Sequence, residues 1–318
     1  MDNVRGLFKY LTVANTYFYP LSRTPPMERP ALLVASAAVL YGLILPSAQY
    51  FADMGLSLYE IALLPLLCNL VILVPLALRE GSRPWRHAPT LATYGLIGAA
   101  LQLAQFGGIV MGLPIAAAAM LLNTQPLWSL ALGRLLLGES VTGRKLMACL
   151  VAFLGVAVLL APSLAGGYKP IAALLGGLSG LFLSLWVVWG RRCRVIGMTP
   201  VGTAAGFATT SALWLLVLQP ILAPLGGWAR LAPALAPLQW SFLLLLATVS
   251  GTVPHLLFYR GMEKTQASRA GVILLLEPLS ASLIGMWAFG QPPTPYILVG
   301  GALILASNYV VAKDIQQG

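Results

Sequence analysis

The chain contains ten apolar stretches in succession, and this series constrains its fold more than any other feature. A helix needs about 20 mostly apolar residues to cross the hydrocarbon core of a bilayer. Only 9% of the 318 residues are Asp, Glu, Lys or Arg, whereas about 25% is usual in a soluble domain. We therefore predict an all-α membrane protein with ten transmembrane helices. The predicted spans are residues 31–51, 57–78, 90–109, 115–137, 143–162, 171–190, 200–222, 239–259, 269–289 and 295–312.

Basic residues gather in alternate connections between these spans. They follow spans 2, 4, 6, 8 and 10, whereas the opposite connections contain only Lys169 and Arg230. The positive-inside rule then predicts that both termini are cytoplasmic, and we expect the inner (plasma) membrane of a bacterium. This distribution explains the net charge of +10. We expect no nucleic-acid partner, because no basic stripe with interleaved aromatic residues occurs.

Residues 1–28 precede the first span and do not resemble a signal peptide, because prolines and charges interrupt them. Val4, Leu7, Phe8 and Leu11 follow helical spacing. This spacing predicts a short helix that lies on the membrane surface. A partly disordered cytoplasmic tail is the alternative.

Residues 120–139 and 272–291 align with each other without a gap. The positions that recur have structural meaning: a proline, the polar residue before it and two glycines. The pairs are Gln125 and Glu277, Pro126 and Pro278, Gly133 and Gly285, and Gly138 and Gly290. Each half then contains five spans, and an odd number inverts the second half in the membrane. We therefore predict two inverted five-helix repeats, residues 29–162 and 163–318, with a solute site near the midplane where they meet.

The same stretches carry the features of a known family. These are Ala116 to Ala119, Gln125-Pro126, Gly138-Glu139 and Gly155 in the first half, and Ser268-Arg269-Ala270, Glu277-Pro278, Gly285 and Gly290 in the second. With these features the chain resembles the drug/metabolite transporter (DMT) superfamily of the EamA type over residues 31–313. The resemblance implies a ten-helix carrier that exports or exchanges small organic solutes. The chain departs from the family pattern at Gln291, where a second Glu is usual.

Glu277 is the only carboxylate deep within a predicted span. An ionised carboxylate at that depth costs several kcal/mol, so the group should be protonated, paired or turned towards a water-filled cavity. We consider two roles, a proton-coupling or substrate-binding group, and a structural group that satisfies carbonyls freed by Pro278. His255, beside Pro254 in the eighth span, is a second candidate for proton coupling.

Amide side chains recur within the predicted spans. Such groups bind polar solutes without a charge, and they also hold neighbouring helices together. We predict substrate contacts for Gln102, Gln105, Asn123 and Gln125, and helix contacts for Asn69 and Asn308. Among the aromatic residues in or near the spans, which include Tyr41 and Trp186, we select Trp128 for the substrate site because it follows the break at Gln125-Pro126.

The sequence offers little for chemistry at a cofactor. It contains three Cys and two His, and none of them has the spacing of a familiar zinc or haem site. We expect no cofactor and no resident metal. Because no paired carboxylates and no nucleophile with a base occur, we do not expect an enzyme.

These observations favour a secondary active transporter that exports or exchanges a small metabolite, such as an amino acid, by alternating access. The energy source would be the proton gradient or exchange. The alternative is a membrane scaffold subunit that uses a carrier fold without transporting. Ten helices suffice for a complete pathway, so we expect a monomer, with a dimer as the other arrangement.

Overall fold

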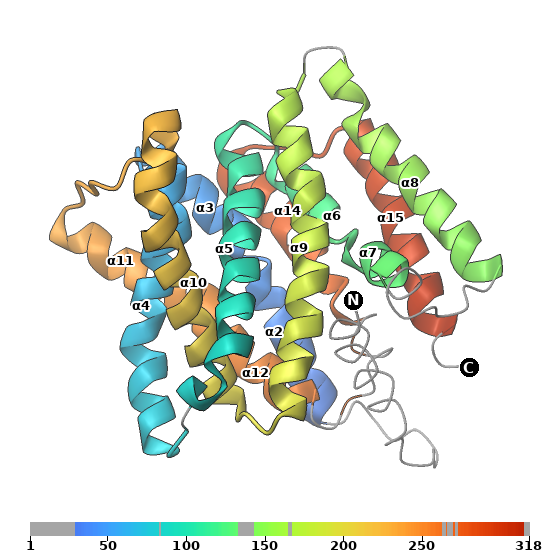
Figure 1. The fold of residues 1–318 in the computed structure, drawn as a ribbon. Helices are drawn as coiled ribbons and strands as arrows, with labels where there is room; N and C mark the ends of the chain where they lie inside the picture. Colours follow the sequence, from blue (N-terminus) through green and yellow to red (C-terminus); the bar gives the residue numbers. More distant parts are fainter. Residues whose placement is uncertain are drawn as a thin grey trace.

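The computed structural model describes residues 29–82, 84–132, 143–164, 167–262, 265, 270 and 273–314, and within them it contains helices and connecting turns only (Figure 1). The predicted surface helix in residues 1–28 lies outside the described residues, as do Gly133, Gly138, Glu139, Ser268 and Arg269.

The α-helices are α2 (Arg29–Tyr41), α3 (Ile44–Asp53), α4 (Leu58–Arg79), α5 (Ala88–Val110), α6 (Ile115–Leu122), α7 (Gln125–Leu132), α8 (Gly143–Leu164), α9 (Pro170–Val195), α10 (Pro200–Leu222), α11 (Pro237–Ala247), α12 (Val253–Met262), α14 (Leu276–Phe289) and α15 (Pro295–Asp314). Short 3₁₀ turns occur at Pro84–His87, Ala223–Leu225 and Gly227–Ala229, and a π-helical turn at Thr248–Thr252.

The described helices form ten segments in the order of the predicted spans, so the ten-helix fold is confirmed. Three segments consist of two helices joined end to end: α2 with α3, α6 with α7, and α11 with α12. Seven segments of the described chain have at least 18 residues and an apolar composition that suits a membrane span. Two further apolar helices, Leu146–Pro162 and Pro295–Val310, are shorter.

The two halves pack in a pattern that is preserved when each helix is exchanged for its counterpart five spans away. The contact of α5 with α9 corresponds to that of α12 with α2, and the contact of α5 with α10 to that of α11 with α4. In three further contacts the exchange only swaps the two partners, so the contact is unchanged. These are α8 with α15, α6 with α14 and α4 with α10. Figure 1 shows α5 and α9 side by side in the middle of the bundle and α8 along α15 at one edge. This exchange is what inverted repeats require.

The crossing of α8 and α15 shows the same relation at the level of single residues. Counterparts lie 152 positions apart, as Pro126 and Pro278 do. A Cβ atom added to Gly155 would lie 2.8 Å from the carbonyl oxygen of Gly300, so the two backbones touch. The counterpart contact is a hydrogen bond of 2.6 Å from the Ser307 hydroxyl to the Ala148 carbonyl. Small residues therefore bring these two helices together, as they commonly do in membranes.

Two helices are interrupted at corresponding places. A turn at Asn123 and Thr124 separates α6 from α7, and a turn at residues 274 and 275 precedes α14. The first turn comes directly before Gln125-Pro126, and the second is separated from Glu277-Pro278 by Leu276 alone. Proline lacks the N–H that would continue the helical hydrogen bonds. The first segment also breaks, at residues 42 and 43, and the eighth contains the π-helical turn. The interrupted segments provide polar backbone groups in the middle of the bundle.

Candidate functional site

A cavity of about 190 Å³ lies among the interrupted segments. Residues of both halves line it, and we call it the central cavity. Most of its lining is apolar or aromatic. The more polar lining residues are Ser47, Asn69, Gln102, Gln105, Asn123, Gln125, Ser250, Thr252, His255, Glu277 and Asn308, together with the aromatic residues Tyr41 and Trp186.

The central cavity brings together six of the seven residues selected from the sequence. These are Gln102, Gln105, Asn123, Gln125, His255 and Glu277. Trp128 does not line it. Its indole lies against α9, where its Cδ1 atom is 3.3 Å from the position of a Cβ added to Gly180. Gly180 leaves room for the ring, so Trp128 packs α7 on α9 and does not face the cavity.

Glu277 is the second residue of α14 and is half-buried at the wall of the central cavity. Its backbone carbonyl accepts a hydrogen bond of 2.9 Å from the Ser280 hydroxyl. Within the described part of the chain its carboxyl group has neither a hydrogen bond nor an ion pair. The group is therefore available to a solute or a proton.

His255 is held by backbone and aromatic contacts. Its Nδ1 atom lies 2.6 Å from the carbonyl oxygen of Gly251. A carbonyl oxygen only accepts, so Nδ1 carries the proton and Nε2 is an acceptor in the neutral ring. The ring centroids of Tyr41 and Trp186 lie 5.2 and 5.5 Å away, both edge to face, and that of Phe207 lies 6.3 Å away and stacked.

The π-helical turn before His255 is tied to α4. The Thr252 hydroxyl donates to Oδ1 of Asn69 across 2.8 Å, and both residues are buried. Turns of this kind often occur at functional sites because they shift the register of the side chains that follow. Asn69 thus helps to position the segment that presents His255.

The amide side chains of the central cavity are joined to one another and to the backbone. Gln105 donates to Gln102. Gln125 donates to Ser129 across 2.8 Å, and Ser129 is 2.8 Å from Ser184 of α9. Asn308 of α15 donates to the backbone carbonyl of Asn123 across 2.6 Å. These bonds hold the amides in defined orientations at the cavity wall.

Three buried polar atoms at the cavity wall lack a partner in the described part of the chain. They are the hydroxyl of Tyr41, Nε1 of Trp186 and Oδ1 of Asn308. Buried polar groups are nearly always hydrogen-bonded in folded proteins, and leaving one unpaired costs about 1–3 kcal/mol. These two donor groups and one acceptor belong to residues that line the cavity, although the atoms themselves are buried in this conformation. The sequence indicated Tyr41 and Trp186 only as aromatic residues of the spans.

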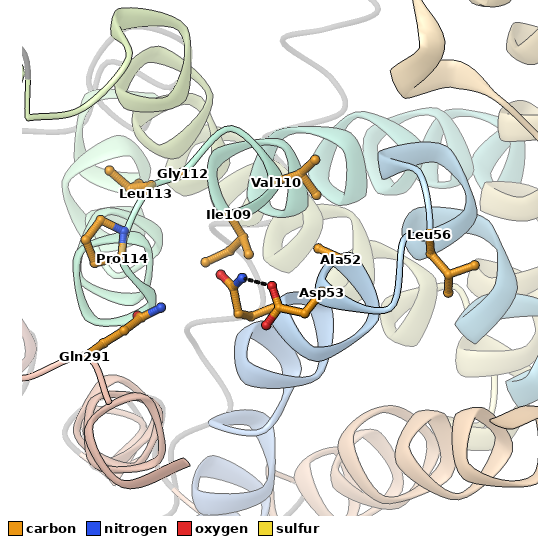
Figure 2. A pocket seen from close by; sticks show the side chains of 10 residues that line it. Ala52, Asp53, Leu56, Ile109, Val110, Gly112, Leu113, Pro114 and Gln291 are labelled. Atoms are coloured by element: carbon orange, nitrogen blue, oxygen red, sulfur yellow. Dashed lines mark hydrogen bonds between the residues drawn. The ribbon is translucent and has the colours of Figure 1, made fainter. Parts of the chain in front are cut away.

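A second hollow, of about 460 Å³, lies at the end of the bundle that the basic residues predict to be extracytoplasmic. We call it the outer pocket. The end of α3, the α5–α6 connection and Gln291 after α14 form its walls (Figure 2). Asp53 contributes the only carboxylate among the described residues that line it, and this group accepts a hydrogen bond of 2.8 Å from Gln49.

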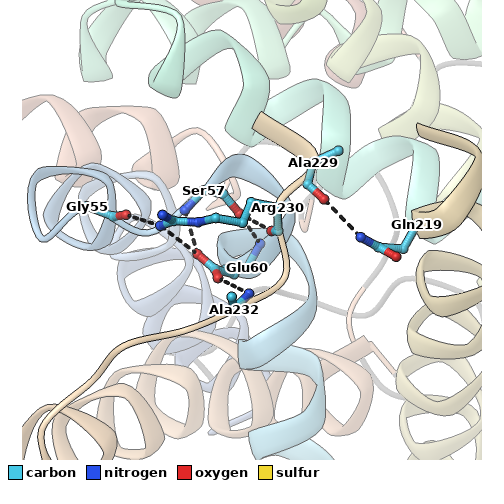
Figure 3. A network of polar contacts seen from close by, with 7 residues as sticks. All are labelled: Gly55, Ser57, Glu60, Gln219, Ala229, Arg230 and Ala232. Atoms are coloured by element: carbon cyan, nitrogen blue, oxygen red, sulfur yellow. Dashed lines mark hydrogen bonds and ion pairs between the residues drawn. The ribbon is translucent and has the colours of Figure 1, made fainter. Parts of the chain in front are cut away.

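A further carboxylate, Glu60, is fully buried in the first turn of α4. It accepts the backbone N–H groups of Ser57 and Ala232, each across 2.7 Å, and Arg230 lies 3.9 Å from it (Figure 3). These contacts attach the loop after α10 to the start of α4. Sequence reasoning missed Glu60, although a serine followed three residues later by a glutamate is the pattern of a helix-capping box.

Comparison with known proteins agrees with this architecture. The EamA-like transporter family matches residues 29–161 and 170–313, which is most of the chain in two consecutive units. The chain belongs to the EamA-like transporter family. It is thus a membrane transporter of the DMT superfamily and not an enzyme.

Several EamA relatives are similar over most of their length. An uncharacterized transporter of Archaeoglobus fulgidus is 27% identical, with 88% of this chain and 95% of the relative covered. A riboflavin transporter of Rhizobium johnstonii is 28% identical (73% and 71% covered), and a "probable terminal-alkyne amino-acid exporter" of Streptantibioticus cattleyicolor is 27% identical (81% and 86% covered). A solved crystal structure has a TM-score of 0.58 at 17% identity, covering 92% of this chain and 100% of the other, and it supports the fold alone.

Proposed function

We propose that this EamA protein is a secondary active transporter that exports or exchanges a small amino acid by alternating access. The observation that carries the proposal is the central cavity, which both repeats line and whose apolar wall includes polar residues, three of them with an unpaired buried donor or acceptor. The cavity is lined by residues of one chain, which supports a monomeric transporter.

The polar groups of the cavity suit a zwitterion. Tyr41 and Trp186 offer donors for a carboxylate, whereas Glu277 and Asn308 offer acceptors for an ammonium group. The aromatic faces around His255 add favourable contacts for a cation. The apolar remainder of the wall suits an uncharged side chain.

One similar transporter is named for riboflavin and another for an amino acid, which makes these two compounds alternative cargoes. The size of the cavity favours the amino acid. Pockets that enclose drug-sized ligands have volumes of about 300–1,000 Å³. A cavity of about 190 Å³ is smaller than this range. A compact amino acid fits that space better than a three-ring flavin with a ribityl chain.

The inverted repeats support alternating access. Halves that can exchange conformations have inward-open and outward-open states of similar energy, with the solute near the midplane. In this scheme Glu277 takes up a proton from one side and releases it to the other, and His255 assists that transfer. Both residues belong to segments that are interrupted next to the cavity.

Uptake into proteoliposomes tests the proposal. Purified protein is reconstituted, a pooled set of labelled amino acids and riboflavin is offered, and a pH gradient is imposed or omitted. Glu277→Gln is compared with the native protein and with Glu80→Gln, an exposed carboxylate at the end of α4. We expect gradient-driven amino-acid accumulation in the native protein and in Glu80→Gln.

In Glu277→Gln we expect loss of accumulation with counterflow exchange retained. Equal accumulation by native protein and Glu277→Gln would show that Glu277 does not couple transport to protons. Accumulation of riboflavin without any amino acid would overturn the proposed substrate class. No transport by a stable preparation would favour the scaffold function.

A further inference from the structure

The outer pocket has one carboxylate and two amides whose orientations are determined by their partners. Nε2 of Gln49 donates to Oδ1 of Asp53, since a carboxylate can only accept from it. Oε1 of Gln49 and the second carboxylate oxygen of Asp53 are then acceptors at the pocket wall. Within the described residues Asp53 has no ion pair, and Arg230, at the same end of the bundle, contacts Glu60 and the carbonyl of Gly55.

Gln291 offers hydrogen-bond donors to the pocket, whereas Gln49 and Asp53 offer acceptors. Its Oε1 accepts the backbone N–H of Ile115 across 3.0 Å, at the start of α6. This donor requires an oxygen, so the NH₂ group of Gln291 is the part that remains for a ligand. A glutamate here could accept the same N–H but would add negative charge in place of two donors. Figure 2 shows Gln291 and Asp53 on opposite sides of the pocket, which Ile109 also lines.

The outer pocket and the central cavity are separated by one apolar layer. On α3, Ala48 and Phe51 line the central cavity, whereas Ala52 and Asp53 line the outer pocket. On α5, Phe106 faces the cavity and Ile109 the pocket. Phe51 and Ile109 are each 2% exposed, so the layer is closed in this conformation. The outer pocket therefore lies on the predicted extracytoplasmic side of this layer.

We propose that the outer pocket is a second binding site for the transported amino acid. The ammonium group binds Asp53 and Oε1 of Gln49, and the carboxylate binds the NH₂ group of Gln291. The site rests on the proposed function for the identity of its ligand. It takes up solute before or after the Phe51–Ile109 layer opens.

Thiol labelling tests the charge of the pocket without any transport. Ala52→Cys places a thiol beside Asp53, and the native chain is the blank, because Cys68 and Cys149 lie within predicted spans and Cys193 is buried. Membranes are treated with impermeant methanethiosulfonates of similar size, one with a trimethylammonium group and one with a sulfonate. Each reaction rate is divided by the rate of the same reagent with a free thiol. We expect this relative rate to be about tenfold higher for the cationic reagent than for the anionic one, because the Asp53 carboxylate a few ångströms away attracts the cation and repels the anion.

Asp53→Asn in the same background keeps an acceptor for Gln49 and removes the charge, so the rate ratio should return to that of the free thiol. The ratio is independent of the thiolate fraction, which affects both reagents equally. A ratio that Asp53→Asn leaves unchanged would overturn the site.

Protection from labelling tests the ligand. Alanine and its amide, which keeps the ammonium but lacks the carboxylate, are added at increasing concentration. We expect alanine to protect Ala52→Cys at about tenfold lower concentration than the amide. Gln291→Glu should remove this preference while the amide still protects. Failure of both compounds to protect, or a preference that Gln291→Glu does not change, would contradict the proposal.

Glu277→Gln separates this inference from the transport mechanism, because labelling and protection do not require coupled transport. Protection in a native protein that neither accumulates nor exchanges an amino acid would leave the outer site standing and remove the proposed function. Accumulation without protection would retain the proposed function and remove the outer site.

Discussion

Asn308 of α15 donates its side-chain N–H to the backbone carbonyl oxygen of Asn123 across 2.6 Å. In a regular helix this carbonyl would accept the N–H of Leu127. At the turn between α6 and α7, the N–H of Leu127 bonds Thr124 instead. One side chain of the second repeat therefore satisfies the interrupted backbone of the first, directly at the wall of the central cavity.

Asn308→Ala should lower the stability of the protein. It removes the donor and leaves the Asn123 carbonyl buried, which costs about 1–2 kcal/mol for an interhelical bond in a membrane protein. Thermal unfolding in a mild detergent measures the effect as a lower Tm. Tyr309→Phe is the control, since Tyr309 is the next residue and is 48% exposed. Equal Tm values for the two variants would contradict this role of Asn308.

Gly155→Ala should separate α8 from α15. The added methyl group would lie 2.8 Å from the carbonyl oxygen of Gly300, closer than a Cβ atom can approach without a backbone shift. We expect a loss of about 1–3 kcal/mol, the usual cost of overpacking. Gly177→Ala in α9 is the matched control, because a Cβ there has no neighbour within 4 Å. Its helix should be unaffected or slightly more stable, and a larger loss of Tm in Gly177→Ala would refute the close approach.

Much of the fold could be predicted because the bilayer imposes a simple rule on length and composition. Ten apolar stretches became ten helical segments, and Pro126 and Pro278 marked two of the breaks. The π-helical turn was not predicted, since it depends on how α4 packs against the eighth segment through Asn69 and Thr252.

The site could be predicted in part only, because membrane helices are apolar on all sides. Periodicity indicates the inward face of a soluble helix, but it does not show whether Trp128 faces a cavity or a neighbouring helix. Polar residues such as Gln102 and Glu277 could be selected because their burial in lipid is costly. The rings of Tyr41 and Trp186 both contact that of His255, although the three residues belong to segments far apart in the sequence. No local sequence pattern predicts these contacts.

Glu60→Ala should destabilise the protein far more than Arg230→Ala. Glu60 is fully buried and accepts two backbone N–H groups, so its loss leaves both donors unpaired, at a cost of about 1–3 kcal/mol for each. The Arg230 side chain is 57% exposed and 3.9 Å from Glu60, a geometry that contributes about 0–1 kcal/mol. Chemical denaturation of both variants would compare the two losses. A larger loss for Arg230→Ala would show that the contacts of Arg230 with Glu60 and Gly55, and not the hydrogen bonds of Glu60, hold the loop.

Tyr41→Phe should weaken solute binding without destabilising the fold. The Tyr41 hydroxyl is buried at the central cavity with no partner in the described residues, so removing it leaves no other protein group unpaired. A solute that uses this hydroxyl would lose one hydrogen bond, about 1 kcal/mol or roughly fivefold in Kd. Tyr59→Phe is the converse control, because the Tyr59 hydroxyl donates to the Leu215 carbonyl in the buried core. It should lower Tm and leave the Kd unchanged. Binding measured by the shift of Tm with amino-acid concentration separates the two effects, and an unchanged Kd in Tyr41→Phe would exclude this hydroxyl from the solute site.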